Sequence, residues 1–159
     1  MNKILILFLV SLLSCTIPPK KSDWERYQET TLKEFISYFA ADTIINEHPI
    51  LKIVAADAPF KTKVNFTGSI RPISEQKAMC IDDLMGTMKL PRKAKGFADH
   101  EILIEQDGIT LWLVVQNSII SDLQTGNYHN PIEVFFQYFG VVSEGKGAEW
   151  VLLVNNWNG

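Results

Sequence analysis

The spacing of apolar residues predicts that the main domain of this chain begins with a helix. Between 22 and 40 the residues Trp24, Tyr27, Thr31, Phe35, Tyr38 and Phe39 recur at intervals of three and four, and most charged residues fall on other faces. This pattern is typical of an amphipathic helix of about 18 residues. Ser22 and Glu25 have the spacing of a capping box at its start. We expect the aromatic side to pack on the core; a surface that faces a membrane or a partner is the alternative.

The middle of the chain predicts one strand followed by one helix. From Phe60 to Thr67 apolar and polar residues alternate, which indicates a half-buried strand. Gly68 is placed where such a strand bends or bulges, and Pro72 ends it. Ser74 is expected to cap a helix whose apolar positions are Ala78, Ile81, Leu84, Met85 and Met88. The preceding segment 50–56 fits either a short strand or a helical turn.

The last third of the chain reads as strands. Residues 100–105 and 109–115 flank Asp107-Gly108, a strong signal for a two-residue hairpin turn. One helical turn is expected within 118–125, then a turn-rich loop at 127–131. Two further strands are expected at 132–142 and 150–156.

Apolar residues occupy both faces of these late strands, and this decides the expected fold class. In 132–142, Val134 and Phe136 lie on one face while Phe135 and Phe139 lie on the other. In a sheet with one face exposed to water, apolar and polar residues alternate more regularly along each strand. Something must therefore cover the second face, and the helix at 22–40 is the expected cover. We predict an α+β domain, a curved antiparallel sheet or small β-barrel of about five strands with a packed N-terminal amphipathic helix.

The order of the expected elements resembles that of an OB-type barrel. A strand with a mid-strand glycine, a helix, a hairpin, a short connection and two strands follow one another over residues 60–157. The stretch 121–126 leading into Ile132 resembles the entry to the fourth strand of such barrels. The resemblance is topological and carries no signature motif. A different helix-plus-sheet or partial-barrel fold fits the pattern as well.

The first residues resemble a bacterial lipoprotein precursor. Lys3 is followed by an apolar run from Ile4 and then by Leu12-Leu13-Ser14-Cys15. The run is about half the roughly 20 residues that a membrane-spanning helix needs. The resemblance implies a signal peptide at 1–14, cleavage before Cys15, and acyl chains on Cys15 that hold the protein on a membrane. Because Thr16 follows the cysteine where inner-membrane members often carry Asp, it favours the outer membrane over the inner one, with the domain facing the periplasm.

Behind Cys15 the sequence divides into a short tether at 15–21 and one globular domain at 22–159. Without residues 1–14 the chain keeps 14 basic and 18 acidic residues, a net charge of −4. This balance gives no electrostatic case for nucleic acid. Cys15 and Cys80 are the two cysteines, so an acylated Cys15 leaves Cys80 without an intramolecular disulfide partner.

No residue pattern in the sequence supports catalysis, a metal site or a cofactor. Cys80 precedes Asp82-Asp83, whose charges disfavour a thiolate, and we expect it to be buried and inert. His48, His100 and His129 lack the spacing of zinc ligands, and Asp99-His100 is interpreted as a polar pair at a strand edge. We therefore expect that the protein is not an enzyme.

The aromatic residues chosen as candidates for a binding surface are Trp112, Tyr128, Tyr138 and Trp157, with Trp150 beside them. Most of them are expected in the core, and Tyr128, in the polar loop, is the best candidate for exposure. The leading hypothesis is a lipid-anchored accessory, inhibitor or immunity protein that binds another envelope protein. The alternative is a module that binds a small ligand or a glycan.

Overall fold

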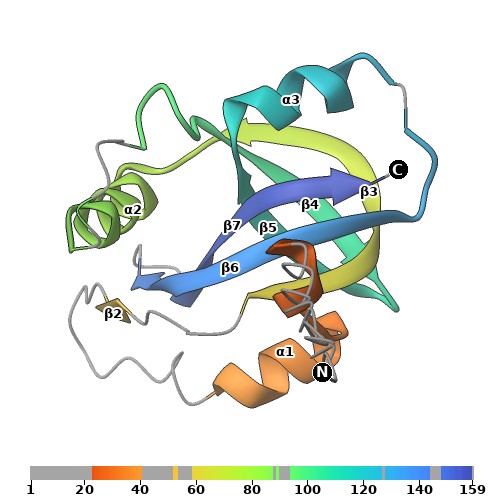
Figure 1. The fold of residues 1–159 in the computed structure, drawn as a ribbon, viewed down its shortest axis with the longest axis horizontal. Coiled ribbons are helices and arrows are strands. Elements are labelled where there is room, and N and C mark those ends of the chain that lie inside the picture. The colour runs from red at the N-terminus through yellow and green to blue at the C-terminus, as the bar shows by residue number, and fades with distance from the viewer. Residues whose placement is uncertain are drawn as a thin grey trace, which may run out of the picture.

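The computed structural model describes residues 23–40, 52–53, 59–87, 89, 94–126, 128–143 and 148–158. Their elements follow the chain as η1 (Asp23–Arg26), β1 (Gln28–Glu29), α1 (Leu32–Phe39), β2 (Lys52–Ile53), β3 (Phe60–Pro72), α2 (Glu75–Thr87), β4 (His100–Gln106), β5 (Ile109–Val115), α3 (Asn117–Gln124), β6 (Ile132–Ser143) and β7 (Ala148–Asn158). The order β3-β4-β5-β7-β6 closes into a barrel because β6 also pairs with β3 (Figure 1). The expected α+β domain with a small barrel is confirmed.

The sheet is mixed, whereas an antiparallel one was predicted. β5 and β7 run parallel, with Val114 beside Leu153 and Val115 beside Val154. A closed ring of five strands cannot alternate in direction all the way round, so one neighbouring pair must be parallel. The short strand β1 adds a second parallel pair against the start of β3.

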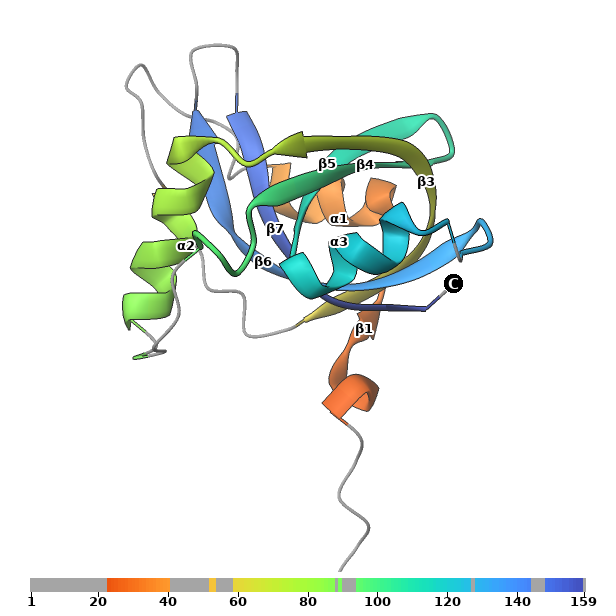
Figure 2. The ribbon, with the colours of Figure 1, turned by 90° about the horizontal axis from the view of Figure 1, so that it is seen from above.

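Apolar side chains fill the interior of the barrel, and α1 and α3 close its two ends (Figures 1 and 2). Phe35 of α1 lies at the centre of this core and is 1% exposed. Its ring centroid is 5.5–5.7 Å from those of four barrel residues, Phe60, Phe136, Tyr138 and Trp150. Ile119, Ile120 and Leu123 of α3 enter the same core.

The N-terminal segment is not the single helix of about 18 residues that the periodicity predicted. It consists of η1, β1 and then α1, which has eight residues. The extended piece forms because Gln28 N–H donates to Pro59 O at 2.8 Å and Thr30 N–H to Lys61 O at 3.0 Å. A capping box lies at Thr31 and Glu34, at the start of α1, whereas Ser22 of the predicted box lies outside the described residues. The aromatic side packs on the core, as expected, through Phe35 and Phe39, while Tyr38 is exposed.

A second apolar cluster lies outside the barrel, under α2. The outward residues Phe139, Val142, Val151, Leu153 and Val114 pack there against Cys80, Ile81, Leu84 and Met85 of α2. α2 therefore covers most of the second face of the late strands, where the N-terminal helix had been predicted; of that N-terminal segment, Tyr27 contacts this face, at Phe135. Phe139, Val142, Val151 and Leu153 lie where α2 packs, whereas Phe135 contacts Tyr27 of the N-terminal segment, with ring centroids 5.4 Å apart.

Several local predictions are confirmed. Gly68 has a φ of +85° where the pairing of β3 with β4 shifts register, and β3 ends at Pro72. Asp107 and Gly108 both have positive φ and join β4 to β5. Ser74 Oγ accepts a hydrogen bond from Lys77 N–H at the start of α2. The segment 50–56 contains a short strand, β2, and 118–125 holds a two-turn helix, α3, where one turn was expected.

Candidate binding site

Two neighbouring strands of the barrel separate at one point. β5 pairs with β7 only at Val114 and Val115, although β5 begins at Ile109 and β7 at Ala148. Extending that register backwards would place Leu111 beside Trp150 and Thr110 beside Glu149. Within the described residues, Ile109–Leu113 pair with β4 alone. Over Ile109–Leu113, one edge of β5 therefore has no strand beside it among the described residues.

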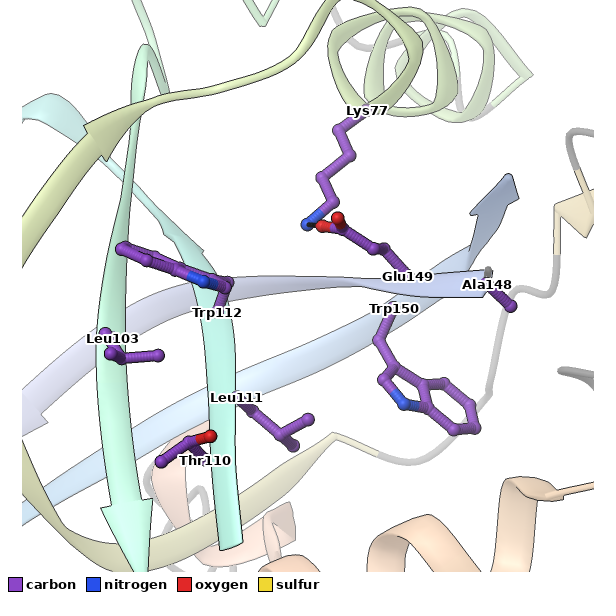
Figure 3. A pocket seen from close by; sticks show the side chains of 8 residues that line it. All are labelled: Lys77, Leu103, Thr110, Leu111, Trp112, Ala148, Glu149 and Trp150. Carbon is purple, nitrogen blue, oxygen red and sulfur yellow. Dashed lines mark ion pairs between the residues drawn. The ribbon is translucent and has the colours of Figure 1, made fainter. Parts of the chain in front are cut away.

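A hollow of about 310 Å³ lies where the two strands separate. We call it the β5–β7 hollow. Its lining residues are Lys77, Leu103, Thr110, Leu111, Trp112, Ala148, Glu149 and Trp150, and Figure 3 shows their side chains around the open space. Its volume is at the lower end of the range of about 300–1,000 Å³ that is typical of ligand pockets. The lining mixes aliphatic and aromatic side chains with three polar ones.

Four charged side chains, Arg71, Lys77, Glu101 and Glu149, form one network beside the hollow, which we call the charge cluster. Lys77 Nζ lies 2.5 Å from Glu101 Oε1 and 2.8 Å from Glu149 Oε2. Arg71 Nε lies 2.8 Å from Glu101 Oε2, and its Nη2 lies 2.9 Å from Glu149 Oε2. The side chains of Lys77 and Glu101 are 1% and 0% exposed, whereas those of Arg71 and Glu149 are each 37% exposed. Two cations thus face two carboxylates, and the cluster is neutral in sum.

The cluster is built from four separate elements. Arg71 comes from the end of β3 and pairs across the sheet with Glu101 of β4. Glu149 comes from the start of β7. Lys77 comes from the first turns of α2, and its side chain reaches from the helix towards Glu149 (Figure 3). The cluster therefore joins α2 to the barrel at the edge of the second apolar cluster.

The pKa of the Glu149 carboxyl is set by opposing effects. Burial alone raises its pKa, but the hydrogen bonds and charges of Lys77 and Arg71 outweigh burial and lower it. Glu149 is thus ionised at neutral pH. Both of its ion pairs use Oε2, and Oε1 accepts no hydrogen bond from the residues that the structure describes. Within the described residues, this second carboxylate oxygen therefore has no hydrogen-bond donor.

Trp112 forms a wall of the hollow and is held by the charge cluster. The guanidinium carbon of Arg71 lies 4.2 Å from the centroid of its ring, a cation–π contact. This contact covers one face of the indole. Of the residues predicted for binding, Trp112 is the one that lines the hollow, together with Trp150, which is otherwise buried in the barrel core.

The other predicted binding aromatics lie elsewhere. Tyr138 is fully buried in the barrel core, where its ring contacts Phe35 and Trp150, so a surface ligand does not reach it. Tyr128 is half-buried against Phe66, with ring centroids 5.3 Å apart. Trp157 lies on β7 opposite Val134 and packs on the same core. Neither Tyr128 nor Trp157 lines the hollow.

Cys80 and the carboxylates considered for acid–base chemistry lie in positions that serve packing and turn formation. Cys80 is completely buried, and burial, together with the charge of Asp83, raises the pKa of its thiol to about 12. The Asp99 carboxylate accepts hydrogen bonds from Gly96 N–H at 2.8 Å and Asn117 Nδ2 at 2.7 Å. It therefore shapes the turn before β4. Asp82 accepts from Ala94 N–H, and Asp83 is exposed on α2.

The sequence reasoning missed the whole charge cluster, although one signal was present. Lys77 precedes Ile81 and Leu84 by four and seven residues, which puts a lysine on the apolar face of the predicted helix. A lysine at such a position requires a buried partner. Nothing in the sequence identified Glu101 or Glu149 as that partner.

Cys15, the predicted lipidation site, and the tether at 15–21 lie outside the described residues. Among the described residues, no three His, Cys, Asp or Glu side chains are grouped so that they could hold a metal ion. The same part of the chain includes no helix with the length and apolar character needed to cross a membrane. Comparison with protein-family models, with curated proteins and with solved structures finds no match.

Proposed function

We propose that this protein is a non-catalytic lipoprotein, anchored through acyl chains on Cys15, whose barrel binds another protein of the cell envelope. The observation that supports binding most directly is the β5–β7 hollow beside an unpaired strand edge. Its two titratable side chains, Lys77 and Glu149, are already paired with each other, which suits recognition better than proton transfer. The resemblance of residues 1–15 to a lipoprotein precursor supports the anchor and the envelope location.

We infer that the barrel is of the OB type. The strand order β3-β4-β5-β7-β6, the parallel contact of β5 with β7, and a helix between β5 and β6 support this assignment. Such barrels commonly bind ligands on the outward side of the second and third strands, here β4 and β5. Leu103 and Trp112 lie opposite each other on those strands and both line the hollow.

A broad apolar interface is not the basis of the proposal. Among the described residues the large apolar side chains that are exposed are Tyr38 on α1 and Met79 on α2. Two isolated side chains on different helices do not make an apolar patch of a few hundred Å². Recognition is therefore assigned to the hollow and the strand edge.

The first experiment is a crosslinked pull-down of the full, lipid-bearing protein from its own envelope, with Cys15→Ala as the control that is not acylated. We expect one partner to be recovered with the anchored protein and to be lost or reduced with Cys15→Ala. Labelling with radioactive palmitate should mark the first protein and not the second. If Cys15→Ala still fractionates with membranes and carries label, the anchor is refuted. If the anchored protein recovers no partner, the protein-binding function is refuted.

A small ligand or a glycan is the second candidate, and the volume of the hollow with Trp112 in its wall is the observation in its favour. A glycan would stack on an open face of an aromatic ring. Arg71 already covers one face of Trp112, so at most the other face is open to a sugar. Titration of the protein with soluble envelope saccharides, followed by tryptophan fluorescence, separates the two candidates. Saturable quenching that Trp112→Phe abolishes would favour the glycan.

A further inference from the structure

The β5 edge and the β5–β7 hollow together form a site with a specific kind of occupant. We propose that this site binds an uncharged, extended peptide segment of the partner, which pairs with β5 over Ile109–Leu113 and places one aliphatic side chain in the hollow. The inference rests on the proposed function, because it names the form in which that partner is recognised.

The unpaired edge determines that the occupant is extended. Alternate residues of Ile109–Leu113 direct their backbone N–H and C=O groups away from β4, towards the side where β7 would lie. Only an extended backbone offers donors and acceptors at the matching repeat. A sugar or a helical segment could form hydrogen bonds with at most a few of these backbone groups.

The lining determines which side chain enters the hollow. Leu103, Leu111, Trp112, Ala148 and Trp150 contribute carbon surface from three strands. In an added strand successive side chains point to opposite faces, so alternate residues point to the side of Leu103 and Trp112. The volume of about 310 Å³ has room for an aliphatic side chain of the segment.

The charge cluster determines that the segment is neutral. Arg71 and Lys77 already balance Glu101 and Glu149. A basic side chain would be a third cation beside Lys77, and an acidic one would be a third carboxylate beside Glu149. A neutral segment leaves this balance of charges undisturbed.

The test uses a phage library of random twelve-residue peptides, selected on the full chain in detergent micelles. Thr110→Phe is the blocking variant, because Thr110 is exposed and lines the hollow, so a ring there occupies the site without disturbing the core. Thr125→Phe is the matched control, an exposed threonine at the end of α3 outside the lining. Ala148→Phe, from the opposite wall, is a second blocking variant should Thr110→Phe unfold.

We expect enriched peptides without charged residues at their centre, rich in β-formers and with an aliphatic residue at a fixed position. Thr110→Phe should raise the Kd of a synthetic peptide of that sequence by at least about tenfold, and Thr125→Phe should leave that Kd unchanged. The bound peptide should slow hydrogen exchange at residues 109–113. Enriched peptides that bind both variants equally, that protect other residues, or that carry a conserved charge at the centre would overturn the inference. The inference would also be overturned if no selected peptide bound the unmodified protein more tightly than it bound Thr110→Phe.

The two proposals fail in different ways. If the pull-down recovers an envelope partner and Thr110→Phe does not affect it, the protein-binding function stands and the peptide site is refuted. If peptides sensitive to Thr110→Phe are selected but no envelope partner exists, the site stands and the protein-binding function is refuted.

Discussion

The replacement Lys77→Met tests whether the charge cluster holds α2 on the barrel. Methionine keeps most of the volume of the lysine stem and removes only the ammonium group. Lys77 is 1% exposed, and it contacts Glu101, which is 0% exposed, so the substitution leaves a carboxylate buried with one partner fewer. A carboxylate left in this way carries a desolvation cost that its lost partner no longer offsets.

The magnitude follows from the two contacts that are lost. Breaking a buried ion pair by removing one partner costs about 3–5 kcal/mol. Glu101 keeps Arg71 Nε at 2.8 Å, which places the cost near the lower end of that range. The contact with Glu149 adds little, because that side chain is 37% exposed and an ion pair so accessible to water is worth less than about 1 kcal/mol. We expect Lys77→Met to lower the free energy of unfolding by about 3 kcal/mol, a large part of a typical stability of about 5–15 kcal/mol.

Urea unfolding followed by tryptophan fluorescence measures this change. With a dependence on urea of about 2 kcal/mol per molar, the midpoint should fall by about 1.5 M. The double variant Lys77→Met with Glu101→Leu should recover more than half of the loss, because it removes the stranded carboxylate as well. A change of less than about 0.5 kcal/mol in the single variant would refute the reasoning, since that is the usual effect at an exposed position. The reasoning would also be refuted if the double variant were destabilised by as much as the two single variants together.

Four other residues give independent checks of the core, the ion pairs, the thiol and the hairpin. Phe35→Ala should cost about 3–5 kcal/mol in urea unfolding, because Phe35 is almost completely buried among aromatic rings. The pKa of Glu149 is lowered in the folded protein, so the stabilisation by its carboxylate is present above its unfolded pKa and is lost as the pH falls through the folded pKa. The decrease in Tm between about pH 6 and pH 3 should therefore be smaller for Glu149→Gln than for the unmodified protein. The Cys80 thiol should react with a disulfide reagent at about pH 8 only after unfolding, and rapid reaction of the folded protein would contradict a pKa near 12. Gly108→Ala should cost about 1 kcal/mol because its φ is +78°, whereas the control Gly86→Ala, in α2, should stabilise slightly; both sites have room for a methyl group, so equal effects would contradict a backbone cause.

Local chemistry in the sequence predicted the elements that depend on it. The hairpin at Asp107-Gly108 and the bulge at Gly68 require backbone angles that few residues adopt, and the residue types reveal them. The helix after Ser74 has both a cap and an apolar face. In these segments the residues that determine the structure lie within a few positions of one another.

The N-terminal segment shows where that reasoning fails. The spacing of its aromatics fits one long helix, yet Gln28 and Glu29 pair with Phe60 and Lys61, about thirty residues away. Periodicity does not detect such a distant strand, whose hydrogen bonds outweigh the local preference for helix. The capping box at Thr31 and Glu34 begins α1 only after this short strand.

The candidate site depends even more on distant residues. Trp112 was selected as an aromatic, but the hollow beside it arises because β5 and β7 pair only over their later residues. Arg71, Glu101 and Glu149 occur in the sequence as ordinary strand charges. They become a site only when closure of the barrel and the packing of α2 bring them within 3 Å of Lys77 or of one another.

Stability alone does not account for the charge cluster. Apolar side chains of similar volume at Lys77 and Glu101 would hold α2 against the barrel as well or better, because replacing a buried ion pair by well-packed apolar residues is often neutral or stabilising. The second apolar cluster under α2 already supplies that kind of contact. Apolar residues at Lys77 and Glu101 would leave Glu149, which lines the hollow, and Arg71, which lies over the ring of Trp112, without these ion-pair partners. The cost of burying these charges is therefore better explained by the geometry of the β5–β7 hollow than by the stability of the fold.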